Sequence, residues 1–282
     1  MLRKNDWREE ALIIMTTHFS SGVTNVKGKA NGTSLFSGIK QPLITGATTP
    51  AEWAFQDDFV QFSQVTTAPW TIVDPGGGSY MLAQYAQGWL RMGDAGPSAA
   101  DIAIAASEDV FQYHSQKAWY FETKIAVTDV TELNTFVGFC ANGHVNPNAV
   151  PDDGIGFSHL EDTTTIQFVS RKNGAGVSFD MLDSAGGSTY TFADSSITTQ
   201  SATAYNMPDN AVRLGFLFQP VGSAPGVTAV QFQLFLDGKS VGTQAATTVP
   251  DDLLMELKMM TESKGTVAND LYVDYVQTVQ QR

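Results

Sequence analysis

The feature that most constrains the fold is a recurring pattern of short alternating segments. From residue 55 to the C-terminus, runs of β-branched and aromatic residues are separated by turns rich in Gly, Pro, Asp and Asn. Roughly fifteen such runs follow one another with no helical pattern between them, which is typical of two packed antiparallel sheets. The sequence therefore predicts an all-β sandwich over residues 51–282.

Several segments of this pattern carry specific expectations. Residues 119–127 alternate between two faces, with Glu122 and Lys124 on the same face, and predict a half-buried strand. Asn173-Gly174 and Asp237-Gly238 predict tight hairpins, because type I′ turns need positive φ angles that glycine adopts readily. Residues 109–114 and 188–192 are also expected to be strands. Residues 253–261 are compatible with a helix, but their place before a final strand favours a strand.

Residues 1–50 lack this pattern and carry the opposite charge. They contain six Lys or Arg and three Asp or Glu, a net charge of +3, whereas residues 51–282 contain ten and 26, a net charge of −16. A segment this rich in Gly, Ser, Thr and Asn cannot bury enough apolar surface to fold alone. We therefore expect an extended N-terminal arm, ordered only against a partner or a neighbouring copy. The charges of the arm either dock on an acidic protein surface or only solvate it. Its expected contact residues are Phe19, Lys27, Lys29, Leu35, Phe36, Ile39, Lys40, Leu43 and Ile44.

The composition argues against several classes of protein. An acidic body disfavours nucleic acid and anionic membrane as partners, because binding to phosphate depends on clustered Lys and Arg. The single cysteine, Cys140, rules out an intramolecular disulfide and lies in an apolar run, so we expect a buried hydrophobic residue. Residues 11–15 are too short an apolar run for a signal peptide, whose core needs about seven residues. No run reaches the roughly 18 apolar residues of a membrane span, and we expect the protein to be made in a cytoplasm.

Catalytic signatures are missing from the sequence. Retaining glycosidases need two carboxyl groups about 5–5.5 Å apart, but Glu122 and Glu256 are each followed two residues later by a lysine and indicate solvated or salt-bridged positions. There is no Gly-x-Ser-x-Gly motif, and the glycines at 76–78 open no helix that would hold a phosphate. We expect no enzyme activity, no catalytic residue, no metal and no cofactor.

One loop nevertheless combines residues that are able to hold a sugar or an ion. Oxygen atoms of Asp and Asn bind Ca²⁺, but the spacing here matches no defined metal loop, and such residues often form Asx turns instead. Four of the five tryptophans, at 53, 70, 89 and 119, either stack on a sugar or belong to the core, where large aromatic residues are common. The candidate glycan or ion residues are Asn142, His144, Asn146, Asn148, Asp152 and Asp153.

Several short motifs also occur in an informative order. They are Asp57-Asp58-Phe59, residues 119–122, residues 136–139, residues 153–157, residues 230–238, Pro250-Asp251-Asp252 and residues 271–276. This order resembles the concanavalin A-like lectin and glucanase superfamily, and the resemblance implies a jelly-roll β-sandwich. The layout is also similar to decoration or cement proteins of tailed-bacteriophage heads. Those proteins combine a lectin-like sandwich with an arm that lies across capsid subunits, often as trimers.

The resemblance implies two functions. The first is a structural virion protein that decorates or cements the outer surface of a phage capsid. Its partners would be the major capsid protein and further copies of itself, as a homotrimer on the virion surface after synthesis in the host cytoplasm. The second is a carbohydrate-binding, lectin-like module used in attachment, which would bind a surface glycan through the loop at residues 143–151. A glucanase-like enzyme is disfavoured by the missing glutamate pair.

Overall fold

The computed structural model describes the greater part of the predicted sandwich. The described residues are 52–59, 70–73, 79–82, 89–93, 102–107, 109, 111–115, 117–183, 187–195, 208–218, 230–246, 248–264 and 269–281. The predicted N-terminal arm and all of its expected contact residues lie outside them. Within these ranges every regular element is a β-strand. No helix in the same ranges is long and apolar enough to cross a membrane.

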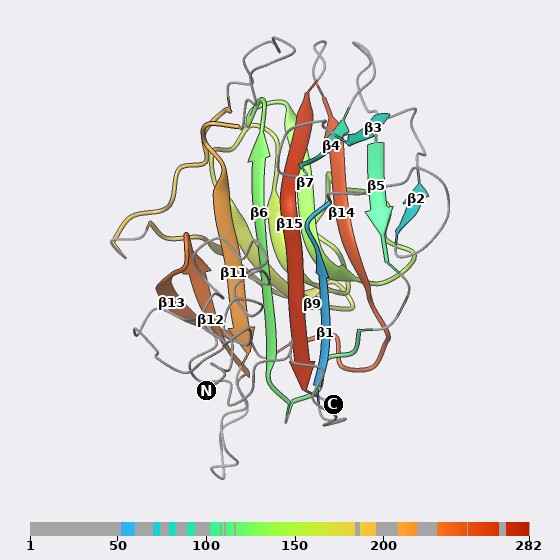
Figure 1. The fold of residues 1–282 in the computed structure, drawn as a ribbon. Helices are drawn as coiled ribbons and strands as arrows, with labels where there is room; N and C mark the ends of the chain where they lie inside the picture. The colour runs from blue at the N-terminus through green and yellow to red at the C-terminus, as the bar shows by residue number, and fades with distance from the viewer. Residues whose placement is uncertain are drawn as a thin grey trace, which may run out of the picture. The chain divides into compact units, whose positions relative to one another are not determined.

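Eight strands form the first sheet, called sheet A. They run in the order β13-β12-β11-β6-β15-β4-β3, with β1 also paired to β15, and the ladders around β15 are antiparallel. β15 joins β6 along one edge, and along its other edge it joins first β4 and then β1 (Figure 1). The strands of sheet A are β1 (Glu52–Asp57), β3 (Ser79–Leu82), β4 (Leu90–Gly93), β6 (Trp119–Val127), β11 (Val212–Phe218), β12 (Val230–Leu236), β13 (Lys239–Ala246) and β15 (Asp270–Gln281).

Seven strands form the second sheet, called sheet B, in the order β10-β9-β8-β7-β14-β5-β2. β14 begins at Glu256, so the segment predicted at 253–261 is a strand, as expected, although it starts three residues later. The predictions of strands at 109–114 and 188–192 were wrong, because the described residues of these segments form only isolated bridges, Phe111 with Met255 and Thr189 with Leu182. The strands of sheet B are β2 (Thr71–Val73), β5 (Ile102–Ala106), β7 (Leu133–Cys140), β8 (Gly154–His159), β9 (Gln167–Lys172), β10 (Ala175–Asp180) and β14 (Glu256–Ser263).

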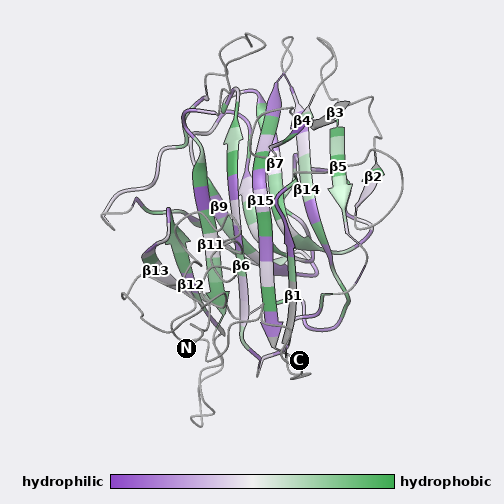
Figure 2. Cartoon of the chain, in the orientation of Figure 1, coloured by the Kyte–Doolittle hydropathy of each residue, from purple (hydrophilic) through white to green (hydrophobic). Residues whose placement is uncertain are grey.

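The two sheets are held together by a cluster of aromatic side chains. The ring of Phe139 on β7 lies with its centroid 4.5 Å from that of Trp119 and 5.2 Å from that of Phe121, both on β6. Phe216 on β11 extends the cluster to Phe168 on β9, at 5.7 Å. All five side chains are buried, and each contributes about 1.5–3 kcal/mol through burial. Figure 2 shows hydrophobic and hydrophilic residues alternating along strands such as β15.

Strand β6 departs from the half-buried strand that the sequence predicts. Its residues are buried on both faces, and only Lys124 is intermediate. Glu122 is 2% exposed and accepts hydrogen bonds from the hydroxyls of Tyr120 and Tyr275. Lys124 pairs with Asp274 on β15, 2.9 Å away, rather than with Glu122. The predicted solvated or salt-bridged face is therefore confirmed for Lys124, which is salt-bridged, and wrong for Glu122, which is buried and hydrogen-bonded to two tyrosines.

Both predicted hairpins are confirmed. Asn173 and Gly174, between β9 and β10, have φ angles of 51° and 73°. Asp237 and Gly238, between β12 and β13, have φ angles of 50° and 77°. Two consecutive positive φ angles are the mark of a type I′ turn, whose twist matches that of the flanking strands.

Candidate functional site

A buried lysine and its hydrogen-bond partners lie beside a cavity on the outer face of sheet B, the face that points away from sheet A. Side chains alternate along β14, so that Leu257 and Met259 enter the core between the sheets while Glu256, Lys258 and Met260 lie on the other face. Lys258 pairs in register with Gly138 of β7 and with Ala106 of β5. The loop that joins β7 to β8, residues 141–153, contacts this face and is called the β7–β8 loop below.

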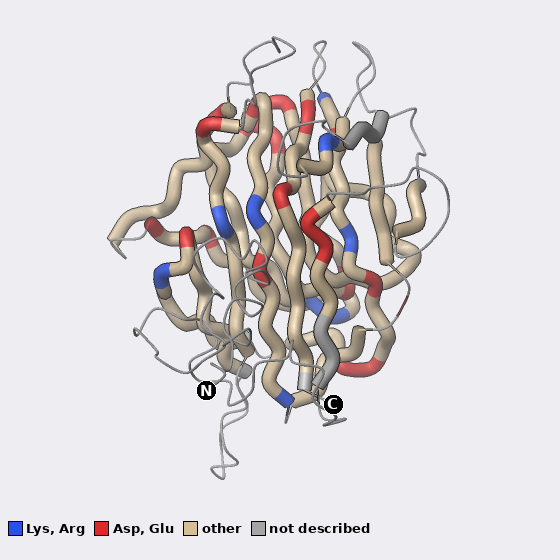
Figure 3. The backbone as a smooth tube through the Cα atoms, viewed as in Figure 1, with Lys and Arg blue, Asp and Glu red and all other residues tan. Residues whose placement is uncertain are grey.

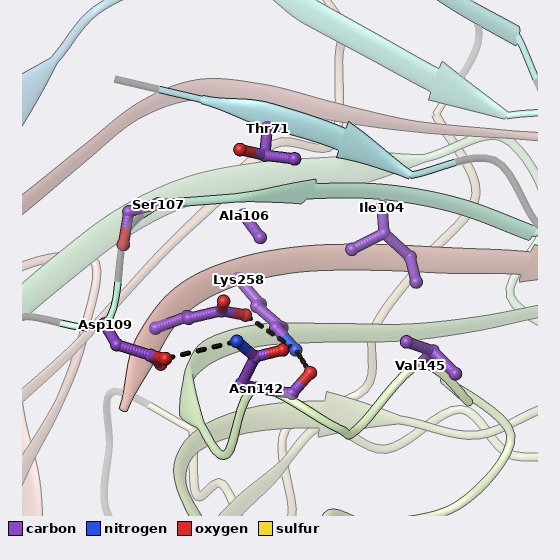
Figure 4. A pocket seen from close by; sticks show the side chains of 9 residues that line it. Thr71, Ile104, Ala106, Ser107, Asp109, Asn142, Val145 and Lys258 are labelled. Atoms are coloured by element: carbon purple, nitrogen blue, oxygen red, sulfur yellow. Dashed lines mark hydrogen bonds and ion pairs between the residues drawn. The ribbon is translucent and has the colours of Figure 1, made fainter. Parts of the chain in front are cut away.

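A cavity of about 420 Å³ opens where this loop meets β2, β5 and β14, and it is called the sheet-B pocket. Figure 4 shows its side chains converging from these elements on one space. Apolar and polar groups share the wall, which is the usual composition of a small-molecule site. The lining residues are Thr71, Ile104, Ala106, Ser107, Asp109, Asn142, Val145, Glu256 and Lys258.

Lys258 carries the one positive charge among the described residues that line the pocket. Its side chain is 2% exposed, and its Nζ lies 2.8 Å from Oε2 of Glu256. The same Nζ donates to the backbone carbonyls of Ala141 at 3.1 Å, Asn142 at 2.6 Å and His144 at 2.9 Å. A buried cation is costly unless it is paired and hydrogen-bonded, and this one has both kinds of partner.

Asn142 and Val145 bring the β7–β8 loop to the rim of the pocket. The Nδ2 of Asn142 donates to Oδ2 of Asp109 at 3.1 Å, across from the loop (Figure 4). Val145 is 43% exposed, and only it and Leu254 are exposed large hydrophobic residues in the described part of the chain. The same loop therefore carries an exposed amide, which is able to hydrogen-bond a hydroxyl group, and an exposed apolar group, which is able to contact an apolar face of a ligand.

His144 lies beside this surface in an environment that disfavours its charge. Burial lowers the pKa of His144, and the nearby Lys258 ammonium lowers it further. Asn146 and Asn148, farther along the loop, are exposed, and Oδ1 of Asn146 accepts the backbone N–H of Asn148 at 3.2 Å. That bond is an Asx turn, so Asn146 stabilises the loop locally rather than lining the pocket.

The two aspartates at the end of the loop serve the neighbouring hairpin. Oδ1 of Asp153 accepts the backbone N–H of Asn173 at 2.7 Å, and the carbonyl of Asp152 accepts that of Gly174 at 2.9 Å. Of the six residues predicted in this loop, Asn142 lines the pocket, and His144 contacts the lining residue Lys258 through its backbone carbonyl. Asn146, Asn148, Asp152 and Asp153 are absent from its lining. Within the described residues, no group of three or more His, Cys, Asp and Glu could hold a metal ion.

Cys140 and the described tryptophans belong to the interior. Cys140 is fully buried, as predicted, and burial raises the pKa of its thiol to about 12. Trp89 and Trp119 are 0% and 1% exposed. Trp70 is 4% exposed, and its indole N–H donates to Oδ2 of Asp57 at 2.7 Å. These three rings offer no platform for a sugar, and the side chain of Trp53 lies outside the described residues.

Sequence reasoning missed most of the lining. Thr71, Ile104 and Ala106 look like ordinary strand residues, and Asp109 was placed in an expected strand. Lys258 carried the one usable signal, because a charged pair at alternating positions interrupts an apolar strand. That signal was interpreted as a solvated or salt-bridged face, and the buried ion pair with Glu256 bears out the second alternative. The three carbonyl partners could not be predicted, because they lie more than one hundred residues away in the chain.

Comparisons with known proteins bear on the fold. A protein of unknown function from Shewanella oneidensis MR-1 superposes with a TM-score of 0.53 at 14% identity, over 84% of this chain and 90% of that one. The carbohydrate recognition domain of Emp47p superposes with a TM-score of 0.50 at 9% identity, over 83% of this chain and 98% of that domain. The chain has a lectin-like jelly-roll fold. No family model and no curated protein matches the sequence.

Proposed function

We propose that this chain is a carbohydrate-binding module and that the sheet-B pocket binds a neutral, hydroxyl-rich saccharide. The observation that carries the proposal is the pairing of Asn142 with Asp109 beside the exposed Val145, at the mouth of a cavity of about 420 Å³. Cavities of about 300–1,000 Å³ with apolar walls and a few polar groups are the usual size for small ligands. The lectin-like fold, shared with a carbohydrate recognition domain, supports the same function.

The charges of the pocket favour a ligand without negative charge. Asp109 and Glu256 are both acidic, while the ammonium of Lys258 is directed at four oxygen atoms of the protein. Figure 3 shows acidic residues at several turns and strand ends, with basic residues dispersed. A sialylated, uronic or sulfated sugar would meet two carboxylates, and the described lining offers it no cation besides the paired Lys258. The hydroxyl donors of a neutral sugar, in contrast, suit acceptor oxygens.

We propose binding without turnover. In the pocket, Glu256 is paired with Lys258, and Asp109 accepts a hydrogen bond from Asn142. In this proposal these contacts give both carboxyl groups a structural or ligand-binding role, in place of the separate acid and nucleophile that a glycosidase requires. A saccharide that binds should therefore be recovered intact after long incubation, and release of a shorter product would contradict this part of the proposal.

A glycan array followed by titration of the best neutral saccharide tests the proposed site. Asn142→Ala removes a donor at the rim and should weaken binding about tenfold, the effect of one lost hydrogen bond. Asn148→Ala is the matched control, because Asn148 is an exposed asparagine of the same loop outside the lining, and it should leave affinity unchanged. Equal affinity in both variants, or an array with no saturable binding, would contradict the proposal.

Decoration of a tailed-phage capsid, as a homotrimer bound to the major capsid protein, is a second candidate. The observation in its favour is the charge division of the sequence, +3 over residues 1–50 and −16 over residues 51–282. The arm would bind capsid subunits while the acidic body stays outside. Deletion of residues 1–45 should abolish co-sedimentation with capsids, and retained binding would contradict the arm hypothesis. Both functions can coexist in one attachment protein at the virion surface.

A further inference from the structure

We propose that Lys258 is a built-in cation that fixes the β7–β8 loop in its binding form, so that the sheet-B pocket binds saccharide without a divalent metal. The inference rests on the proposed function for its ligand, but the ordering of the loop is a separate property. Lys258 is a positioning residue here, since its Nζ contacts protein oxygens and not the saccharide.

The surroundings of Nζ resemble those of a bound metal ion. Four oxygen atoms, one from a carboxylate and three from backbone carbonyls, lie between 2.6 and 3.1 Å from it. Carboxylate and carbonyl oxygens are also the ligands that Ca²⁺ selects. An ammonium group has three protons to share among these oxygens. Unlike a metal ion, that of Lys258 is covalently attached to the sheet, on β14 between β7 and β5.

The carbonyls held by Lys258 belong to the first residues of the β7–β8 loop. The carbonyl of Asn142 accepts from Nζ at 2.6 Å, while the side chain of the same residue donates to Asp109 at 3.1 Å. The carbonyl of His144 directly precedes Val145, so the apolar rim residue is fixed as well. Both loop residues that line the pocket are therefore positioned through Lys258.

Burial makes this arrangement sensitive to loss of the charge. Lys258 is 2% exposed, and Glu256 is its only carboxylate partner among the described residues. Removing one member of a buried pair leaves the other charged and uncompensated, which is far more costly than losing an exposed ion pair. Three carbonyls would also lose the Nζ donor at the same time, and among the described residues only that of Ala141 keeps a further donor, the backbone N–H of His144.

The loop itself supplies a readout that does not depend on any sugar. The backbone N–H of Ala141 donates to the carbonyl of Asp153, and that of His144 donates to the carbonyl of Ala141, both at 3.1 Å. Amide hydrogen exchange at these two positions reports how often the loop opens. Lys258→Met, which keeps an unbranched side chain only one atom shorter and without charge, should accelerate both exchange rates by about tenfold or more.

Lys172→Met is the matched control. Lys172 also pairs with carboxylates, Asp251 at 2.7 Å and Asp252 at 3.0 Å, but this ion pair lies at the exposed surface. Its loss should leave the exchange of Ala141 and His144 within twofold of the wild-type rates. Unchanged exchange in Lys258→Met would overturn the role of Lys258, whether or not a saccharide has been found.

Chemical rescue separates the missing ammonium from a general packing defect. In Lys258→Ala, n-propylammonium can replace the deleted part of the side chain, whereas tetramethylammonium has no N–H to donate. The first ion should restore slow exchange and saccharide affinity, and the second should not. Rescue by neither ion, in a variant that still folds, would contradict the proposal.

The metal requirement is tested on the wild-type chain with the best saccharide from the array. Affinity should be unchanged within twofold after treatment with EDTA and after addition of Ca²⁺. Loss on chelation and recovery with Ca²⁺ would overturn the inference while leaving the proposed function intact. Absence of any saccharide binding would contradict the proposed function, and the exchange rates would still decide the role of Lys258.

Discussion

Glu122 provides the sharpest test of the packing of sheet A. Its side chain is 2% exposed and accepts three hydrogen bonds, from the hydroxyls of Tyr120 and Tyr275 at 2.5 Å each and from Nε2 of Gln277 at 3.2 Å. Burial and the charge of Glu122 raise the pKa of both tyrosines, so the phenols stay protonated and remain donors at neutral pH. Tyr275→Phe removes one of these donors with little change in shape.

The expected cost follows from the charge of the acceptor. A hydrogen bond to a charged group contributes about 1.5–3 kcal/mol to stability. Since Gln277 still donates to the same oxygen at 3.2 Å, we expect a loss near the lower end, about 2 kcal/mol. For a domain of this size each kcal/mol lowers the melting temperature by about 2–4 °C, so the variant should melt about 4–8 °C below the wild type.

A double-mutant cycle in urea isolates the interaction. Unfolding followed by tryptophan fluorescence gives the free energies for Tyr275→Phe, Glu122→Gln and the double variant. If the carboxylate and the phenol interact as described, the coupling energy should be about 1 kcal/mol or more. Effects of the two substitutions that add to within about 0.3–0.5 kcal/mol would refute the reasoning.

Three further predictions concern the core, a close strand approach and pH. Phe139→Ala, at the centre of the aromatic cluster, should lower the free energy of unfolding in urea by about 3–5 kcal/mol, and a loss below 1 kcal/mol would contradict the packing. Gly156→Ala should lower the free energy of unfolding by about 1–3 kcal/mol, because the added Cβ would lie 2.7 Å from the Cα of Gly138. Gly143→Ala is the control and should be near neutral in the same assay, because a Cβ there meets nothing within 4 Å. Since His144 has a lowered pKa, the folded loop binds fewer protons than the unfolded chain. Its stability should therefore fall as pH drops below about 6.5, and His144→Gln should flatten this dependence in amide exchange.

Local features of the chain were predictable from sequence, because their causes are local. The Asn173-Gly174 and Asp237-Gly238 turns need only a residue pair that adopts positive φ, and the structure has both. Residues 119–127 form a strand, as predicted, and Phe121, Ile125 and Val127 share the core between the sheets. The order of strands and motifs was sufficient to predict a jelly-roll sandwich, which the structure confirms.

Properties that depend on distant partners were not predictable. Tyr275 lies 153 positions from Glu122 in the chain, and no pattern near Glu122 reveals that it is buried. Lys258 lies 117 positions from Ala141, so its role in the β7–β8 loop appears only after β14 and β7 are paired. The pocket was not predictable for the same reason, because its residues come from β2, β5, β14 and two loops that are far apart in the chain.

The most direct test of the central claim is a crystal structure of the protein with its best saccharide from the glycan array. The account predicts the sugar in the sheet-B pocket, with hydroxyl groups on Asn142 and Asp109 and its apolar face on Val145. A saccharide bound on any other face of the sandwich, with this pocket left empty, would contradict it.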